Sequence, residues 1–429
     1  MSLENLNKIT LRNGIRILLM KEERVRSVSI GIYINEGGRF ETPETMGITH
    51  FIEHMLFKGT ATRTSLEIAQ LIDYVGGQVN AYTSKAVICA YANVASRHIN
   101  QITELLCEIV TNSAFDENDV ATERGVILEE IAMCEDDPSE IIYSLTNSAV
   151  WEGSMLGAEI LGTRETVGSF TGAQMKEYAR ERFTPEKIIV SVCGNFNDEE
   201  IVDTVCRYFS SEPANPSDIT LPERHIEEAK FVSAFVTERH DFEQNKMTLC
   251  FPAFSFLDAR YDAMYILSII IGGGSSSRLF RKIREQLGLV YDISCYVSCH
   301  EREGMFCVSL SVGAEKEEIA LSESVKILRE TAENGVSEEE FIRAKEHYKV
   351  GCELSLEEIH EQSSLAASDE AILSYVRTLD MILADTEKIT LEEINTLARE
   401  LIDFGKCSFI SAGNVKEPEY YSDIIEKYN

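Results

Sequence analysis

Two histidines and a glutamate stand within one short segment of the sequence, HFIEH, at residues 50–54. The surrounding stretch GITHFIEHMLF contains no proline and no glycine after Gly47, so we expect a helix there. Residues four apart lie on the same face of a helix, so His50 and His54 would project from one side. Two neutral imidazoles one turn apart supply two of the four ligands of a tetrahedral zinc site.

Glu53 lies next to His54, where a carboxylate can act without binding the metal itself. There it would take a proton from metal-bound water, whose pKa zinc lowers to about 7, and pass it to a leaving group. The order H-x-x-E-H is that of the inverzincins. No other pair among the eight histidines has this spacing. The competing interpretation is an amphipathic helix in which one histidine faces water and the other is satisfied in the core.

A third protein ligand is still needed, and the segment ATERGVILEEI offers candidate carboxylates. Glu123 and Glu130 are seven residues apart, which is two helical turns, so they would share one helix face. One of them would bind the metal while the other orients the site, as metal-ligating groups generally require. A solvated acidic helix face explains the same pattern equally well. The residues alone therefore leave this choice open.

The elements that must position these side chains fall into two halves of the chain. At 429 residues the chain is too long for one ordinary core, so two or more domains are expected. The stretch 210–224 holds three of the eight prolines and shows no hydrophobic periodicity, which predicts a linker. We therefore place an N-terminal metal-binding domain at 1–210, a linker at 211–224 and a C-terminal substrate-binding domain at 225–429.

The two halves show the same order of predicted elements. Each has an alternating strand, a helix, a pair of strands preceded by glycine, and a long helical stretch. In order, these segments are 27–34, a helix around His50, 76–94 and 114–131 in the first half, and 245–251, 259–271, 289–314 and 334–350 in the second. Hairpins that alternate with blocks of helix indicate an α+β fold. We predict two homologous domains, each a mainly antiparallel sheet layered with helices.

Charge and composition limit the compartment and the partners. Forty basic residues against 72 acidic ones give a net charge of −32, which repels nucleic acid and anionic lipid. The N-terminus is polar and no apolar run approaches 18 residues. We therefore expect that the protein is neither secreted nor inserted into a membrane. The eleven cysteines are scattered singly, as in a reducing compartment. We therefore expect a cytoplasmic protein with no nucleic-acid and no membrane partner.

Taken together, these residues resemble a known family, the pitrilysin and mitochondrial-processing-peptidase group of zinc metallopeptidases, especially its smaller two-domain bacterial members. The resemblance covers essentially the whole chain. It is carried by the H-x-x-E-H motif, by a glutamate at the family's spacing downstream, by FKGT at 57–60 and by GGQVNAYT at 76–83. These motifs are the positions of this chain to which the resemblance assigns the residue roles of the family.

The resemblance implies a role for each candidate residue of the metal site. One zinc ion per chain would be bound by His50, His54 and Glu130. Glu53 would be the general base, and Glu123 would support the site. Glu129 is the residue most easily confused with the third ligand, and the family's spacing favours its neighbour.

The resemblance also implies a binding edge for the substrate. The strand within 76–83 resembles the sheet edge onto which an extended peptide adds, where backbone pairing accepts any sequence. Its candidate substrate-binding residues are Asn80, Ala81 and Thr83. Without the resemblance, Asn80 is readily explained as a turn or strand-end residue.

A second signature of the family is present in the C-terminal half, in GGGSSSRLFRKIREQLGLVY. An arginine and a tyrosine seven residues apart would reach the substrate from there, which selects Arg284 and Tyr291. They would stabilise the charge that a peptide carbonyl gains as it becomes tetrahedral. Arg278 and Arg281 are nearby alternatives, and a helix-surface arginine is the plainer interpretation. The corresponding helix of this half reads DAMYILSIII and carries no His-Glu-His set.

These observations and the resemblance predict a zinc-dependent endopeptidase that cleaves extended or unfolded peptides. The resemblance implies a clam-shell arrangement around an enclosed chamber, and homodimers among the smaller members. The main alternative is a non-catalytic scaffold or partner subunit of a processing-peptidase-like complex, which the intact metal set disfavours. A third candidate is a zinc hydrolase acting on a non-peptide ester or amide, against which only the resemblance argues.

Overall fold

The computed structural model describes residues 5–215, 218–221 and 226–427. Residues 216–217 and 222–224 of the predicted linker, and the first four residues of the chain, lie outside the described residues. The chain forms two compact units that are interleaved along the sequence. The first unit comprises Met1–Ala132, Ala158–His225 and Glu353–Leu379, and the second comprises Met133–Gly157, Ile226–Cys352 and Asp380–Asn429.

The first unit is built on a six-stranded sheet with the strand order β1-β2-β6-β3-β5-β4. Its strands are β1 (Leu6–Thr10), β2 (Arg16–Lys21), β3 (Ser27–Ile34), β4 (Gln78–Thr83), β5 (Ile88–Ala95) and β6 (Ile188–Gly194). β2 pairs with β6 in parallel, whereas the other neighbours pair antiparallel. β1 and β4 are therefore the two edges of this sheet.

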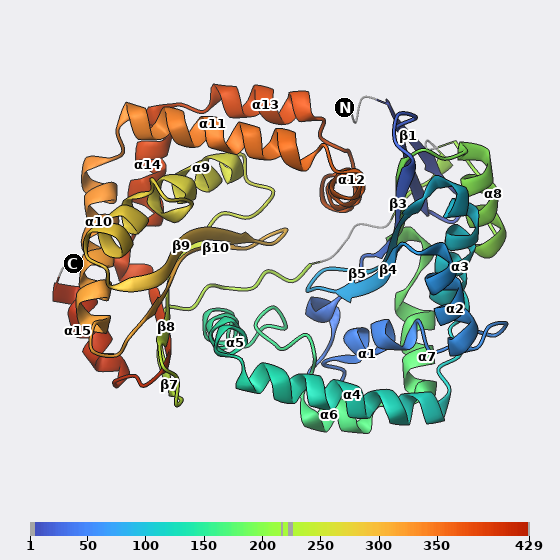
Figure 1. Ribbon diagram of the computed structural model, residues 1–429, viewed down its shortest axis with the longest axis horizontal. Coiled ribbons are helices and arrows are strands. Elements are labelled where there is room, and N and C mark those ends of the chain that lie inside the picture. The colour runs from blue at the N-terminus through green and yellow to red at the C-terminus, as the bar shows by residue number, and fades with distance from the viewer. Residues whose placement is uncertain (1–4, 216–217, 222–225, 428–429) are drawn as a thin grey trace. The chain divides into compact units, whose positions relative to one another are not determined.

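Helices cover both faces of the first sheet. The helices of this unit are α1 (Ile48–Met55), α2 (Ser65–Val75), α3 (Ile99–Asn112), α4 (Glu117–Asp136), α6 (Arg164–Ser169), α7 (Gly172–Arg182), α8 (Asp198–Tyr208) and α12 (Ile359–Leu373), with short 3-10 turns η2 (Gly38–Phe40), η3 (Ser96–His98) and η4 (Pro185–Lys187). Of these, α4, α6 and α7 pack with α1 rather than on the sheet. α3 and α8 bury one face, and α12 lies on the other (Figure 1). The alternation along β3 explains this, because Val28, Ile30 and Ile32 join the α3 core while Tyr33 packs toward α12.

The second unit repeats this architecture with a five-stranded sheet in the order β7-β11-β8-β10-β9. Its strands are β7 (Phe235–Arg239), β8 (Asn245–Ala253), β9 (Val290–Cys299), β10 (Gly304–Val312) and β11 (Ser408–Gly413). Its helical segments are α5 (Pro138–Val150), α9 (Tyr261–Gly272), the π-helix η6 (Phe280–Gln286), α10 (Glu317–Asn334), α11 (Glu338–Ser355), α13 (Leu379–Lys388), α14 (Leu391–Leu401), the 3-10 turn η7 (Phe404–Lys406) and α15 (Pro418–Lys427). β9 and β7 form its edges.

The two sheets share one topology. The order β2-β6-β3-β5-β4 corresponds strand by strand to β7-β11-β8-β10-β9, and β7 pairs with β11 in parallel as β2 does with β6. This confirms the predicted α+β fold of two homologous domains. The boundaries at 210 and 225 and the clam-shell arrangement stay predictions.

One helix of each sequence half covers the sheet of the other half. α5 packs on β8 and β11 through the core that includes Trp151, and α12 packs on β3 and β6. The sequence did not predict this exchange, because helical periodicity does not say which sheet a helix covers. Throughout residues 5–215, 218–221 and 226–427, no helix has the length and apolar character needed to cross a membrane.

Candidate metal centre

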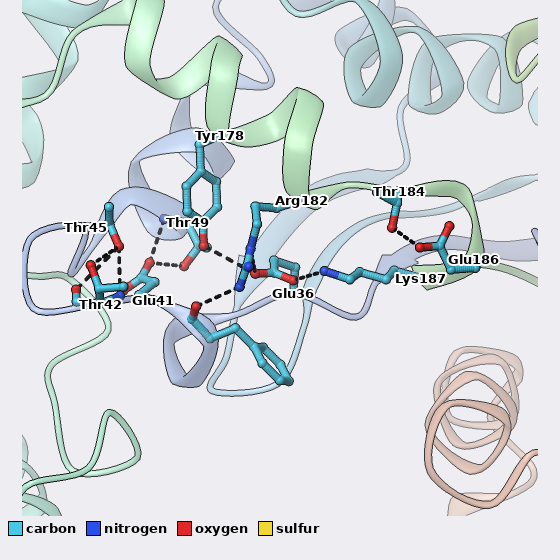
Figure 2. Close-up of polar contacts among 11 residues, drawn as sticks. Glu36, Glu41, Thr42, Thr45, Thr49, Tyr178, Arg182, Thr184, Glu186 and Lys187 are labelled. Carbon is cyan, nitrogen blue, oxygen red and sulfur yellow. Dashed lines mark hydrogen bonds and ion pairs between the residues drawn. The ribbon is translucent and has the colours of Figure 1, made fainter. Parts of the chain in front are cut away.

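The helix α1 carries both histidines, and its N-terminus is held by a buried carboxylate. Glu41 accepts hydrogen bonds from the backbone N–H of Gly47 (2.8 Å), the backbone N–H of Thr49 (2.8 Å) and the Thr49 hydroxyl (2.6 Å), as Figure 2 shows in part. Gly47 adopts φ +90°, and a Cβ there would lie 2.5 Å from the carbonyl oxygen of Leu161. Only glycine fits this turn, so the chain enters α1 in one defined direction.

The segment before α1 is anchored by a second buried carboxylate. Glu36 is 1% exposed and accepts from Arg182 Nε at 2.7 Å and from Lys187 Nζ at 2.5 Å (Figure 2). The Tyr178 hydroxyl donates to the same carboxylate at 3.4 Å. A buried charge is tolerated only when it is paired and hydrogen-bonded, and this one has two cations. The end of β3 is thereby fixed to α7 and to the turn before β6.

α1 packs against α4, which brings the downstream glutamates to the histidines. The shared core also includes α6 and α7, and its buried residues are Ile48, Phe51, Ile52, Met55, Val120, Ile127, Ile131, Val167, Phe170 and Met175. Burying the Ile127 and Ile131 side of α4 turns the adjacent face, with Glu123 and Glu130, toward α1. Glu129 lies on the exposed side of the same helix.

His50, His54 and Glu130 form one cluster, in which a ligand atom from each residue lies within 4.8 Å of the others. Glu130 Oε2 is 3.4 Å from His54 Nε2 and 3.8 Å from His50 Nε2. Two imidazoles and a carboxylate are ligands that zinc prefers, and three protein ligands leave a position open for water or substrate. His50 Nδ1 is buried and has no hydrogen-bond partner in the described part of the chain. The donor set fits a zinc ion.

Glu123 stands behind the cluster. Its Oε1 accepts from His54 Nδ1 at 2.9 Å, and its Oε2 pairs with Lys58 Nζ at 2.5 Å. A carboxylate can only accept, so Nδ1 carries a hydrogen, and once the ring is neutral the Nε2 lone pair faces the cluster. The structure therefore places Glu123 against the His54 ring, a position from which a carboxylate can fix the orientation of an imidazole. In the sequence, Lys58 stands out only as part of the segment FKGT at 57–60, and its spacing does not indicate a contact with Glu123.

Burial and neighbouring charges set the protonation states of the cluster. Burial, followed by repulsion from His54, lowers the pKa of His50 to about 4. Burial also acts to lower the pKa of His54, but the hydrogen bonds that its ring donates to Glu130 and Glu123 outweigh burial and raise that pKa. The hydrogen bond with His54 lowers the pKa of Glu130. His50 is thus neutral and Glu130 ionised near neutral pH, which is what metal binding requires.

Glu53 lies close enough to His54 and Glu130 for their charges to affect its pKa, and it receives a hydrogen bond from β4. The Thr83 hydroxyl donates to Glu53 Oε2 at 3.3 Å. Burial raises the pKa of Glu53, against the opposing charge of His54 and the Thr83 hydrogen bond. A carboxyl group whose pKa is raised toward neutrality suits proton transfer at neutral pH.

β4 is an edge strand, as a peptide-binding strand must be. Ala81 is buried in the core on the α1 side, whereas Asn80 is exposed on the opposite face and accepts from the N–H of Ala81 at 2.9 Å. Of the three predicted substrate-binding residues of β4, the structure brings Thr83 to Glu53. Substrate binding by Asn80, Ala81 and Thr83 stays a prediction.

Arg284 and Tyr291 lie together in the second unit. The Arg284 guanidinium carbon is 5.0 Å from the ring centroid of Tyr291 and 4.6 Å from that of Phe280. Arg284 stands on η6, and π-helical turns recur at functional sites. Of the alternatives, Arg278 is held by Glu340 at 2.7 Å as part of the fold. Contact of Arg284 and Tyr291 with a substrate stays a prediction.

Comparison with known proteins identifies the family of the chain. The family model described as "Insulinase (Peptidase family M16)" matches residues 16–164, and the model described as "Peptidase M16 inactive domain" matches residues 169–348. The uncharacterized zinc protease YmxG of Bacillus subtilis is 37% identical over 96% of this chain and 99% of its own length.

Two solved structures share the fold across nearly the whole chain. A protease from Helicobacter pylori has a TM-score of 0.85 at 18% identity and covers 95% of this chain and 99% of its own. A peptidase M16 inactive domain from Pseudomonas fluorescens has a TM-score of 0.86 at 18% identity and covers 96% and 98%. The likeness to the pitrilysin group is confirmed, and the chain belongs to peptidase family M16, as one of its small two-domain members of the bacterial type.

Proposed function

We propose that the chain is a zinc-dependent endopeptidase that hydrolyses extended or unfolded peptides in an enclosed chamber. The observation that carries the proposal is the meeting of His50, His54 and Glu130, with Glu53 beside them. These three residues would hold one zinc ion per chain. Kinship with zinc proteases supports metallopeptidase chemistry, and the peptide substrate and the residue roles are our proposals.

The chain's own groups divide the work of the reaction. When bound, zinc would polarise the scissile carbonyl and lower the pKa of its water to about 7. Glu53 would accept the proton of the attacking water and deliver it to the leaving amine. Glu123, backed by Lys58, would keep the His54 ring in one tautomer and orientation.

Substrate contacts would come from an edge strand and from the second unit. An extended peptide would add to β4 by backbone pairing, which orders the scissile bond without demanding one sequence. Arg284 and Tyr291 would donate to the carbonyl oxygen as it gains charge. Tyr291 is 75% exposed, so its phenol is available to a ligand.

The test combines metal analysis with digestion of a peptide library by the wild type, Glu53→Gln and Glu129→Gln. We expect one zinc per chain in all three proteins. Cleavage should fall about 100-fold or more in Glu53→Gln, because a general base typically contributes that much, and should stay near the wild-type rate in Glu129→Gln. Undiminished cleavage by Glu53→Gln would remove it as the base. A wild type without zinc or cleavage would favour a scaffold role.

A further inference from the structure

The last residue of β4 faces the general base rather than the free edge of the strand. Side chains alternate along a strand, and Val79 and Ala81 pack into the core on the α1 side. Thr83 follows in the same register, and its hydroxyl donates to Glu53 Oε2 at 3.3 Å. Among the described residues, Thr83 is the only one whose side chain donates a hydrogen bond to the Glu53 carboxylate.

The donor is held in place by a tight hairpin. The β4–β5 turn closes with Ser84 N donating to the carbonyl of Val87 at 2.8 Å. The neighbouring segment binds the same turn, since Gly38 N donates to Ser84 O at 3.1 Å and Arg39 N donates to Lys85 O at 2.9 Å. A Cβ at position 37 would lie 2.4 Å from Ser84 O, so the two backbones touch. The end of β4 therefore has little freedom.

The acceptor is held by the same segment. Two residues after Arg39, Glu41 accepts from the Gly47 N–H at the start of α1. It also accepts from Thr49 in the first turn, as Figure 2 shows. Residues 37–41 thus fix both the strand end that carries the hydroxyl and the helix that carries the carboxylate. Groups on rigid elements tied to one anchor keep their separation, which is the condition for preorganisation.

We propose that Thr83 is a positioning residue for Glu53, rather than a residue that chiefly recognises substrate. Its hydroxyl occupies Oε2, which leaves Oε1 to receive the proton of the attacking water. Without it the carboxylate would rotate about its terminal bond, because no other described side chain donates to it. This inference rests on the proposed peptidase function. The plainer interpretation is that the hydroxyl only satisfies a half-buried carboxylate and so contributes to stability alone.

The test compares Thr83→Val, which removes the hydroxyl at similar shape, with Thr83→Ser, which keeps it. Thr10→Val is the matched control, because Thr10 ends β1 at the opposite edge of the same sheet. We expect kcat to fall about tenfold in Thr83→Val, the size of one hydrogen bond, with KM unchanged. Thr83→Ser should recover most of the wild-type kcat, and Thr10→Val should keep it. Zinc content and unfolding midpoint should match the wild type in Thr83→Val.

Several outcomes would overturn the inference. They are a wild-type kcat in Thr83→Val, a loss not recovered by Thr83→Ser, or a raised KM with unchanged kcat, which would make Thr83 a substrate contact. Crystal structures of zinc-loaded wild type and Thr83→Val give a readout without turnover, since the Glu53 carboxylate should keep one orientation only when the hydroxyl is present. A wild type that binds zinc and cleaves no peptide would reject the proposed function, while the crystallographic comparison would still decide the role of Thr83.

Discussion

Five strands have the same order in the two units, yet among the described residues a candidate metal-ligand set is found in the first unit alone. The difference is clear when α4 is compared with α11. Counted from the first residue of each helix, Ala344 occupies the place of Glu123, and Gly351 occupies the place of Glu130. Both helices bury an apolar stripe against their own unit. The scaffold therefore does not require the candidate metal ligands, which stand on α1 and on one face of α4.

The helices that follow two corresponding strands, α1 after β3 and α9 after β8, show the same contrast. α1 brings His50 and His54 to α4, whereas α9 is YDAMYILSIIIG and buries its apolar residues nearly all round. A helix that is apolar on every side serves packing alone. The comparison teaches that one copy of a duplicated fold can lose, or never gain, a polar face while its core persists. It predicts that the metal site and the fold can be separated by mutation.

The largest expected effect comes from removing the Glu130 carboxylate, because α11 has no carboxylate at the corresponding position. Glu130→Gln should lower zinc affinity by more than about 100-fold, beyond the loss typical of groups that only orient a ligand, and should abolish peptide cleavage. The unfolding midpoint of the metal-free protein should stay unchanged, because Glu130 is partly exposed. Competition with a chromogenic chelator measures the affinity. Glu129→Gln, one residue away on the exposed side, is the control, and equal loss in both variants would contradict the ligand assignment.

A pair of core mutations separates the two units by stability and function. Phe51 on α1 and Phe251 on β8 are both 0% exposed. Each Phe→Ala change should cost about 3–5 kcal/mol of unfolding free energy, because it leaves a cavity. Phe51→Ala should also weaken zinc binding by loosening α1, while Phe251→Ala should not. Urea unfolding and zinc titration give the two readouts, and an equal effect on zinc would break the comparison.

A smaller effect concerns the response to pH. Burial, opposed by the hydrogen bonds from Thr49 and Gly47, raises the pKa of Glu41 from 4.5 to about 7. The folded state then binds more protons than the unfolded state between these values. The contribution of Glu41 to the free energy of unfolding is fully present below pH 4.5 and is lost as pH rises through 7, by up to roughly 3 kcal/mol. Burial of His50, whose pKa is lowered to about 4, contributes a slope of opposite sign below pH 6.5 in every variant that keeps His50. The Glu41 slope is therefore the difference between the unfolding free energies of metal-free wild type and Glu41→Gln, measured from pH 4.5 to 8.

The control for this prediction lies in the second unit and has the opposite sign. The Arg278 guanidinium, with the Ser337 N–H and against partial burial, lowers the pKa of Glu340 to about 2. Its contribution is present above pH 4.5 and is lost as pH falls toward 2. Because this pair is partly exposed, we expect only about 1 kcal/mol after solvent screening. Glu340→Gln should therefore leave the slope between pH 4.5 and 8 unaltered, and a change there would contradict the assignment to Glu41.

Much of the site could be predicted because its signals are local. The spacing of His50 and His54 fixes a shared helix face, and the alternation at 27–34 predicted β3 with the bounds Ser27–Ile34. The duplication was also visible, since each half repeats the same succession of periods. The third ligand was less determined. Glu123, Glu129 and Glu130 all lie on one helix, and the family's spacing rather than the residues chose among them.

Only the tertiary structure decided which distant segments meet. It turned Glu130 toward the histidines and left Glu129 exposed, because Ile127 and Ile131 are buried on the neighbouring face of α4. It also brought Thr83 to Glu53, set Glu41 on the first turn of α1, and placed α5 and α12 on sheets of the opposite sequence halves. Periodicity is written in neighbouring residues, whereas these contacts depend on how buried surfaces fit together. The sequence by itself determined the ligand types and the elements that carry them, and packing decided their partners.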